Sequence, residues 1–418
     1  MSKLSAKHQK IVAGEIARWQ QDGMIEEDLA VKLTSLYPLH SARVNVSQAL
    51  SVVGAVLVGL GAILFMAANW QQIPAIVKLL VILGAVNLTN YFGWKLKFEP
   101  GNQPKMGAAL LLLGSLFYGA AIWLVAQIFN LEVNFSGGIL LWALGTLATA
   151  LATSTLPLGC LAAILGGMWL FANYTWDARQ FLPFVPSLIA YLGTALALAF
   201  HMKSRAVTWI TLVFSGVWML SILGAFNAVP LLLFGLSVVG AYFFVREKQP
   251  LLEQPFLYVG EISTLASLLI ATVSNFRSAE YIRMADLGTL LAICLTILGV
   301  VAWRVPKFKE EMIVCAGLAL VCSLVLGSAP EHSRLIGNVA LLAGIGAFIY
   351  TGLMRIQSAG MVNVALVFFV IDIIARYFDV FYTLMNRSFF FVVGGVLLMV
   401  VGAITERGRR TILEGMHS

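Results

Sequence analysis

Between Val46 and Thr405 the chain consists almost entirely of apolar stretches, each closed by a short polar or Gly/Pro break. The stretches are roughly 17–23 residues long, the length at which a helix rising 1.5 Å per residue crosses ~30 Å of hydrocarbon. We count about 14 of them, a pattern that excludes a sheet and predicts an all-α, polytopic transmembrane bundle.

The predicted spans divide the chain into three parts: a cytoplasmic head at residues 1–45, a transmembrane domain at 46–405 and a tail at 406–418. Two tight breaks, near Thr153 and near Leu223, make the number of spans about 13–15. The expected spans are Val46–Ala68, Pro74–Trp94, Met106–Phe129, Gly137–Thr153, Leu156–Tyr174, Phe181–Phe200, Ala206–Leu223, Phe226–Val245, Pro255–Phe276, Ala285–Trp303, Met312–Gly327, Leu335–Met354, Met361–Arg376 and Phe389–Thr405.

Charge supports this division and orients it. Hydrophobic residues make up 60% of the chain and charged residues 11%, which excludes a water-soluble globule. With the N-terminus inside, only seven of the 27 basic residues fall on the outer side, so both termini are expected in the cytoplasm. Single basic residues scattered through loops do not predict nucleic-acid binding. The seven outer residues are Lys78, Arg179, Arg277, Arg283, Arg334, Arg376 and Arg387.

The head is expected to hold two short helices. Lys7–Gln21 would end at Gly23, and a second helix would carry the apolar stripe Leu29, Leu33 and Leu36. Two short helices bury too little surface to be stable alone. The stripe is therefore expected to dock on its own protein, or else to recruit a cytoplasmic protein partner to residues 1–38.

Two groups of charged residues interrupt the apolar spans, where each charge costs about 2.5–3.5 kcal/mol at the bilayer centre. Glu261 has no basic residue within a helical turn, so its partner must come from another helix, or its carboxyl is neutral. Asp372 and Arg376 share a helix face with Asp379 and can pair locally. The interpretations left open for Glu261, Asp372 and Arg376 are structural pairing and an intramembrane ionisable site for a substrate or ion.

Uncharged polar side chains form a second candidate site. Asn69 ends the first span, and Gln127 and Asn130 end the third. Interhelical amide hydrogen bonds stabilise membrane bundles by roughly 0.6–2 kcal/mol, which makes structural packing one interpretation. A polar pocket lined by Asn69, Gln127 and Asn130 is the other.

Catalytic and metal-binding motifs are missing from the sequence. It contains no HExxH, GxSxG or P-loop motif, and its four cysteines lack CxxC spacing. Its five histidines lie in predicted loops or tails, none paired at metal-ligand spacing. The sequence predicts neither an enzyme nor a bound metal or cofactor.

Three stretches of the sequence resemble one bacterial family. They are Gly59–Trp70, then Gly119–Asn130 followed by Leu140–Gly145, and, near the C-terminus, Ala375–Asp379; the turn from Trp19 to Ile25 in the head also matches. In these residues the chain is similar to the "twenty-one fifty-seven" domain-of-unknown-function group of predicted multi-pass membrane proteins. The resemblance implies a bacterial cytoplasmic (inner) membrane location. It implies no chemistry, because the family has no known activity to transfer.

Two functions from different classes remain. The first is a transporter or flippase-like carrier, proton-coupled through Glu261 and Asp372, with a lipid or small molecule as ligand; span number and Pro-interrupted spans favour it. The alternative is a non-transporting scaffold or sensor whose head recruits a cytoplasmic partner. An intramembrane enzyme acting on lipid-linked substrates ranks below both, because no catalytic residues cluster.

Overall fold

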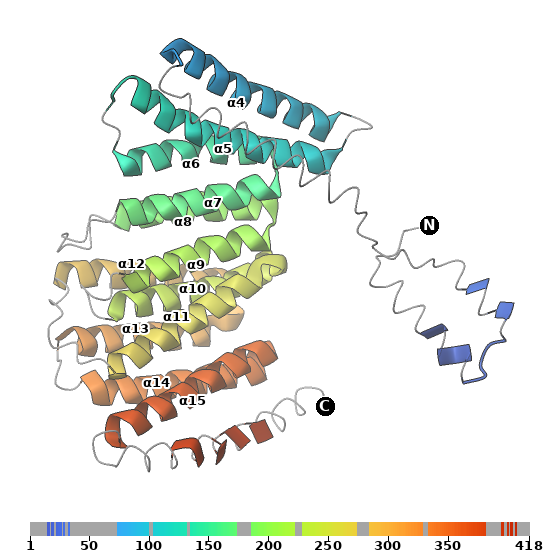
Figure 1. The fold of residues 1–418 in the computed structure, drawn as a ribbon. Helices are drawn as coiled ribbons and strands as arrows, with labels where there is room; N and C mark the ends of the chain where they lie inside the picture. The colour runs from blue at the N-terminus through green and yellow to red at the C-terminus, as the bar shows by residue number, and fades with distance from the viewer. Residues whose placement is uncertain are drawn as a thin grey trace. The chain divides into compact units, whose positions relative to one another are not determined.

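Every element that the structure describes is helical, and no strand occurs among those residues. The structure is a computed structural model (Figure 1). It describes parts of residues 15–33 and 394–407, together with residues 73–99, 103–131, 134–173, 185–221, 228–273, 284–328 and 333–381. The predicted spans at Val46–Ala68 and, for most of its length, Phe389–Thr405 lie outside the described residues.

The helices keep the labels of Figure 1. Short 3₁₀ turns precede α11 (η3, Pro250–Leu252) and α13 (η4, Pro306–Phe308), and a π-helical turn follows α14 (η5, Thr351–Ile356). The α-helices are α4 Ala75–Phe98, α5 Pro104–Ile128, α6 Phe135–Thr153, α7 Leu156–Ala172, α8 Val185–Met202, α9 Arg205–Ser221, α10 Val229–Lys248, α11 Glu253–Val273, α12 Met284–Arg304, α13 Lys309–Ser328, α14 Ser333–Tyr350 and α15 Ala359–Phe381.

The prediction of an all-α membrane bundle is confirmed. Each of the helices α4–α15 coincides, within a few residues, with one predicted span. Eight of the described helices are long and apolar enough to cross a membrane, and three more are apolar but shorter. The count of about 14 spans stays a prediction for the whole chain, since the first span and most of the last lie outside the described residues.

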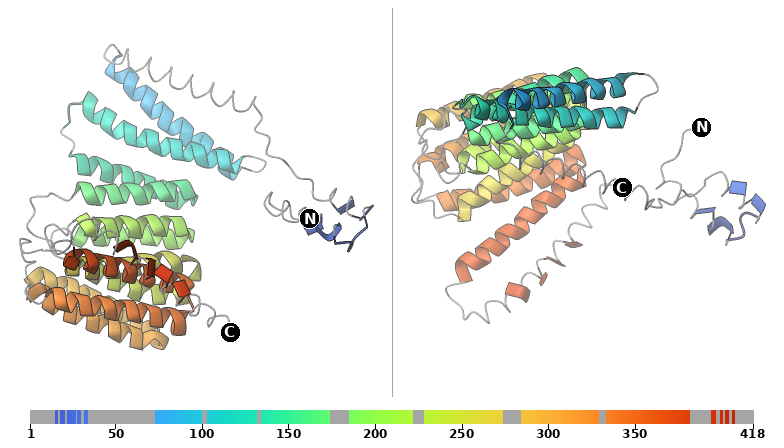
Figure 2. Two further views of the ribbon diagram at one scale, coloured as in Figure 1. Left: turned by 60° about the horizontal axis from the view of Figure 1, so that its bottom comes forward. Right: turned by 45° about the horizontal axis from the view of Figure 1, so that its top comes forward.

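The chain divides into two units, residues 1–78 and 79–418. In the second unit, helices that follow one another along the chain run antiparallel (Figures 1 and 2). Two central helices organise its C-terminal half. Helix α10 contacts α9, α11, α12 and α13, while α11 contacts α9, α10, α14 and α15.

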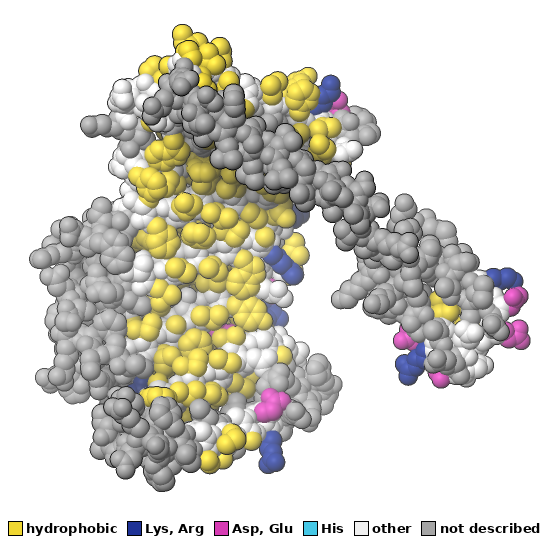
Figure 3. Space-filling view, viewed as in Figure 1, with side chains coloured by type: hydrophobic (Ala, Val, Ile, Leu, Met, Phe, Trp, Pro, Cys, Tyr) yellow, Lys and Arg dark blue, Asp and Glu magenta, His cyan; other side chains and the backbone are white. Residues whose placement is uncertain are grey.

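Burial differs sharply between helices of similar hydropathy. Helix α10 is buried on nearly all sides. Helix α4, in contrast, has a single buried residue, Gly93. Leucines, valines and aromatic residues lie exposed over much of the bundle surface (Figure 3). In water such a surface would be a severe aggregation liability, but a bilayer solvates it.

Basic side chains tie the helix connections together at one end of the bundle, which we call the basic end. Each joins its own helix end to the backbone or a side chain of another connection. The contacts join the α4–α5 connection to the α6–α7 connection and join the α8–α9, α10–α11, α12–α13 and α14–α15 connections to one another, and the antiparallel order of successive helices puts both groups on one side, as the charge pattern predicts. The contacts are Lys97 with the Thr153 carbonyl and with the Thr155 hydroxyl at 2.5 Å, Arg205 with the Leu251 carbonyl at 2.5 Å, Arg246 with the Ile356 carbonyl at 3.3 Å, and Arg355 with Glu311 at 2.5 Å.

In the head, the predicted helix stop is confirmed. Gly23 has φ +71°, and the Met24 N–H donates to the Trp19 carbonyl, which is the pattern of a helix that ends on a left-handed glycine. Of the predicted apolar stripe, Leu29 is 49% exposed and Leu33 is partly buried. Leu36 lies outside the described residues.

Candidate functional site

Glu261 lies near the middle of α11, and its side chain is completely buried. Neither carboxyl oxygen makes a hydrogen bond of normal length and angle in the part of the chain that the structure describes. The carboxyl lies beside the backbone of Ala365 in α15. Burial of an unpaired carboxylate costs several kcal/mol, so these surroundings favour the neutral acid.

Close helix packing makes this burial complete. A Cβ placed on Gly260 would lie 2.8 Å from the Val239 nitrogen, and one on Gly235 would lie 2.6 Å from the Thr264 nitrogen. The backbones of α10 and α11 therefore approach each other directly beside Glu261. Such close approach is what small residues provide at membrane helix interfaces.

Apart from Glu261, α11 carries its one described charge at Glu253 in its first turn, and α15 carries the Asp372–Arg376 pair. Helices α9, α10 and α14 carry their described charges only at their ends or in the adjoining π-helical turn. In α15, Arg376 donates from Nε to Asp372 at 3.2 Å, and the two form an i, i+4 ion pair. Arg376 also donates to the hydroxyl of Thr272 in α11.

Glu261 and the Asp372–Arg376 ion pair lie on the same helix interface. Helices α11 and α15 are in contact and run parallel, because Tyr258 packs on Gly360 near their first turns and Thr272 meets Arg376 near their last. Thr272 and Arg376 are 104 residues apart, as are Glu261 and Ala365. One register thus holds along the interface, which we call the α11–α15 seam.

Distances along the seam follow from this register. Asp372 is seven residues after Ala365, which places the ion pair about 10 Å farther along the axis than Glu261 at 1.5 Å per residue. The structure therefore brings Asp372 and Arg376 together and places Glu261 on the same seam, out of contact with them. The seam holds one paired carboxylate and one unpaired carboxyl. The Asp379 side chain lies outside the described residues.

The candidate polar pocket is placed only in part. Gln127 and Asn130 are exposed at the end of α5, and Asn69 lies outside the described residues. Asn130 has φ +46°, and the following Leu131 N–H donates to the Ala126 carbonyl. Asn130 therefore ends α5 as a left-handed cap. A pocket formed by Asn69, Gln127 and Asn130 stays a prediction.

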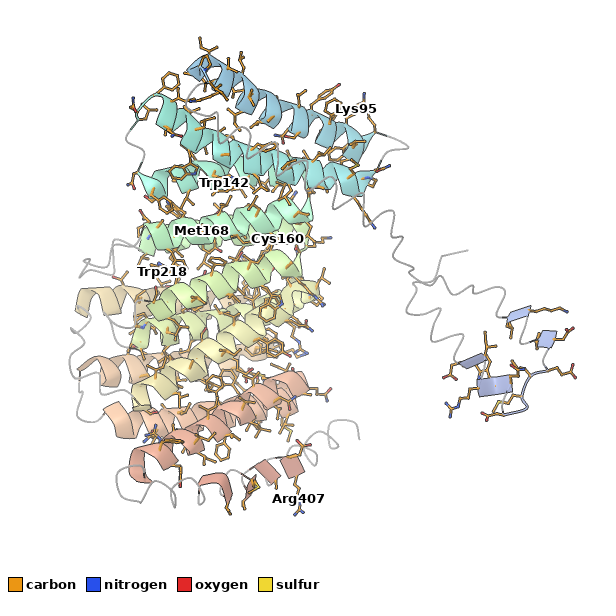
Figure 4. The ribbon with its side chains drawn as sticks, viewed as in Figure 1. Lys95, Trp142, Cys160, Met168, Trp218 and Arg407 are labelled. Carbon is orange, nitrogen blue, oxygen red and sulfur yellow. The ribbon has the colours of Figure 1, made fainter. Side chains whose placement is uncertain are left out.

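The motif formed by Gly119–Asn130 and Leu140–Gly145 is explained by packing between α5 and α6. Aromatic rings of α5 and α6 rest on glycines of the facing helix, where a Cβ would lie 2.2–2.7 Å from the nearest ring atom. The Trp142 Nε1–H donates to the Ser115 carbonyl at 2.9 Å, and the Ser115 and Thr146 hydroxyls are 2.7 Å apart (Trp142 is labelled in Figure 4). The ring–glycine pairs are Trp142 with Gly119, Tyr118 with Gly145 and Trp123 with Gly138.

Three residues that form polar contacts between distant helices could not be identified from the sequence. Thr272 gives no signal, because a threonine in an apolar span is common and its partner Arg376 is 104 residues away. The same holds for Glu311 and Arg355, whose 2.5 Å contact spans 44 residues. Within the described residues, no group of three or more His, Cys, Asp or Glu side chains could hold a metal ion.

Comparison with known proteins gives one match. Residues 17–158 match the model of a family described as "Predicted membrane protein (DUF2157)", the family that the motifs indicate. The resemblance is thereby confirmed over that part of the chain, and membrane protein is the class that the fold and this match define together. No curated protein and no solved structure matches the chain. The α11–α15 seam lies outside the matched residues.

Proposed function

We propose that this protein is a transporter or flippase-like carrier of a bacterial cytoplasmic membrane, with both termini in the cytoplasm and a lipid or small molecule as ligand. One observation carries the proposal: the Glu261 carboxyl is completely buried near the middle of a central helix and has no partner among the described residues. Ionisable residues inside membrane spans mark proton relays and ion pathways more often than structural sites.

Proton coupling follows from the contrast along the seam. Asp372 is held by Arg376, so its charge is compensated in place. Glu261 has no ion-pair partner and no well-formed hydrogen bond among the described residues, so it can change charge only when water or a cation reaches it. A carrier supplies that access by rocking one set of helices against another. Glu261 would then take up a proton when exposed to one side and release it on the other.

Infrared spectroscopy in lipid vesicles tests this idea without knowledge of the ligand. A protonated carboxyl has a C=O stretching band that shifts when its proton is exchanged for deuterium. We expect one such band in the native protein, its absence in Glu261→Gln, and its shift after transfer to deuterium oxide. Asp372→Asn is the matched control and should leave the band in place. A band that persists unshifted would mean that no water path reaches Glu261, and it would refute the proposed carrier function.

A scaffold or sensor remains the second candidate, because the described part of the head exposes apolar side chains. Trp19 is 40% exposed, Met24 70% and Leu29 49%. A partner helix with an apolar face would suit such a surface. If crosslinking in cells captures one protein on the native head and Leu29→Asp abolishes the capture while the infrared band stays unshifted, this second function replaces the first.

A further inference from the structure

A crevice runs between α6, α7 and α8, away from the α11–α15 seam. Its volume is about 120 Å³, and its walls are almost entirely apolar. The Tyr191 ring closes it on the inside, packed against Gly166, while the Tyr191 hydroxyl donates to the Ala163 carbonyl at 3.0 Å. On the outside Leu144 and Thr194 are exposed, so the crevice opens on the outer surface of the bundle.

The crevice has the shape and depth of a site for a hydrocarbon chain. Its walls are Leu140–Leu147, Ala162–Trp169 and Ala190–Leu198, which extend about 10–12 Å along the helix axes at 1.5 Å per residue. All three segments lie in the middle of their helices, at hydrocarbon depth. An empty apolar void forfeits dispersion contacts, and water does not fill it, so the surrounding acyl chains are the available occupant.

Charge at one end of the crevice favours a phospholipid as the source of that chain. His201 follows the crevice residue Leu198 by one helical turn on the same face of α8 and is exposed. Lys203 is exposed in the left-handed position that ends α8, about 7 Å beyond Leu198. The Lys203 ammonium forms no ion pair with the described residues.

We propose that this crevice is a binding site for one acyl chain of an anionic phospholipid whose phosphate contacts Lys203 and His201. The chain lies along the membrane normal between α6 and α8, over the small residues of α7. The headgroup lies at the basic end of the bundle, where cations favour anionic lipids. The site is independent of the proposed carrier function, because no crevice residue belongs to the α11–α15 seam.

Photolabelling tests the site. The full-length protein is placed in phosphatidylcholine nanodiscs that contain a trace of phosphatidylglycerol with a photoactivatable group in mid-chain, and adducts are mapped by mass spectrometry. We expect adducts concentrated on the three crevice walls and their loss in Thr194→Phe, whose ring fills the opening. Gly193→Phe is the matched control, because a Cβ there meets nothing within 4 Å and Gly193 does not line the crevice. It should keep the adducts.

Two further arms separate the sources of the chain. Lys203→Glu should remove the preference for labelled phosphatidylglycerol over labelled phosphatidylcholine, and a labelled free fatty acid should react less than the phospholipid. Excess unlabelled phosphatidylglycerol should displace the label from the native protein, a result that needs no variant to fold. Adducts as dense on the exposed helix α4 as on the crevice would overturn the site. Equal labelling by fatty acid and phospholipid would overturn the assignment to a phospholipid.

Discussion

Gly119→Ala should destabilise the protein, although alanine is the better helix former. The added Cβ would lie 2.2 Å from Cε2 of Trp142, closer than any real contact, and the indole is too rigid to bend away. Overpacking of this kind costs about 1–3 kcal/mol. Movement of the ring would also lose the hydrogen bond from Trp142 to the Ser115 carbonyl, worth about 0.5–1.5 kcal/mol.

The opposing term is helix propensity, which favours alanine over glycine by about 1 kcal/mol. The free energy of unfolding should therefore fall by about 1–3 kcal/mol in Gly119→Ala. The measurement is a titration of the purified protein with sodium dodecyl sulfate in mixed micelles, followed by circular dichroism. Gly137→Ala is the matched control in α6: nothing lies within 4 Å of its added Cβ, so it should be neutral or stabilise by up to about 1 kcal/mol.

A double-mutant cycle shows whether Trp142 causes the loss. In a Trp142→Ala background the clash is absent, so Gly119→Ala should cost nothing and show the alanine propensity instead. If Gly119→Ala destabilises the Trp142→Ala protein as much as it destabilises the parent, the ring–glycine contact is not the cause. The packing explanation of this motif would then be wrong.

Three further predictions concern the ion pair, the head and the topology. Arg376→Met should lower the free energy of unfolding by about 3–5 kcal/mol, because it leaves the Asp372 carboxylate unpaired. Adding Asp372→Leu should recover most of that loss, measured by the same detergent titration. Leu29→Asp should speed proteolytic removal of the head in detergent, whereas equal cleavage rates would mean that the stripe docks nothing. In a cysteine-free protein, a cysteine at Asn134 should react with an impermeant maleimide outside intact cells and one at Lys105 should not; the opposite result would reverse the orientation.

Helix positions could be predicted from the sequence because they depend on local quantities. A run of apolar residues, its length and the Gly or Pro at its end all lie within one segment, and the lipid supplies the rest of the driving force. The predicted span Phe181–Phe200 ends two residues early, since α8 continues to Met202. Shifts of this size are expected where several adjoining residues are equally apolar.

Helix neighbours could not be predicted, and the site depends on them. Glu261 and Asp372 look alike in the sequence, as single carboxylates in apolar spans. A cation four residues away made the Asp372 pair predictable, and the structure shows that pair at 3.2 Å. Nothing local indicates that the backbone beside Glu261 belongs to Ala365, or that Thr272 extends the ion pair to α11. Membrane helices pack through contacts distributed over many small residues, which single-sequence patterns do not resolve.

The shared register of the α11–α15 seam bears on how a carrier could work. A slide of α15 along α11 by one helical turn, about 5.4 Å, would move Arg376 away from Thr272 and displace Ala365 from Glu261 in the same step. The ion pair would travel intact, because Asp372 and Arg376 belong to the same helix. In such a slide, release of the Thr272 contact at one end of the seam would be coupled, through the rigid helix, to a new environment for the carboxyl near the middle. Proton exchange at Glu261 would follow from helix movement without breaking any charge pair.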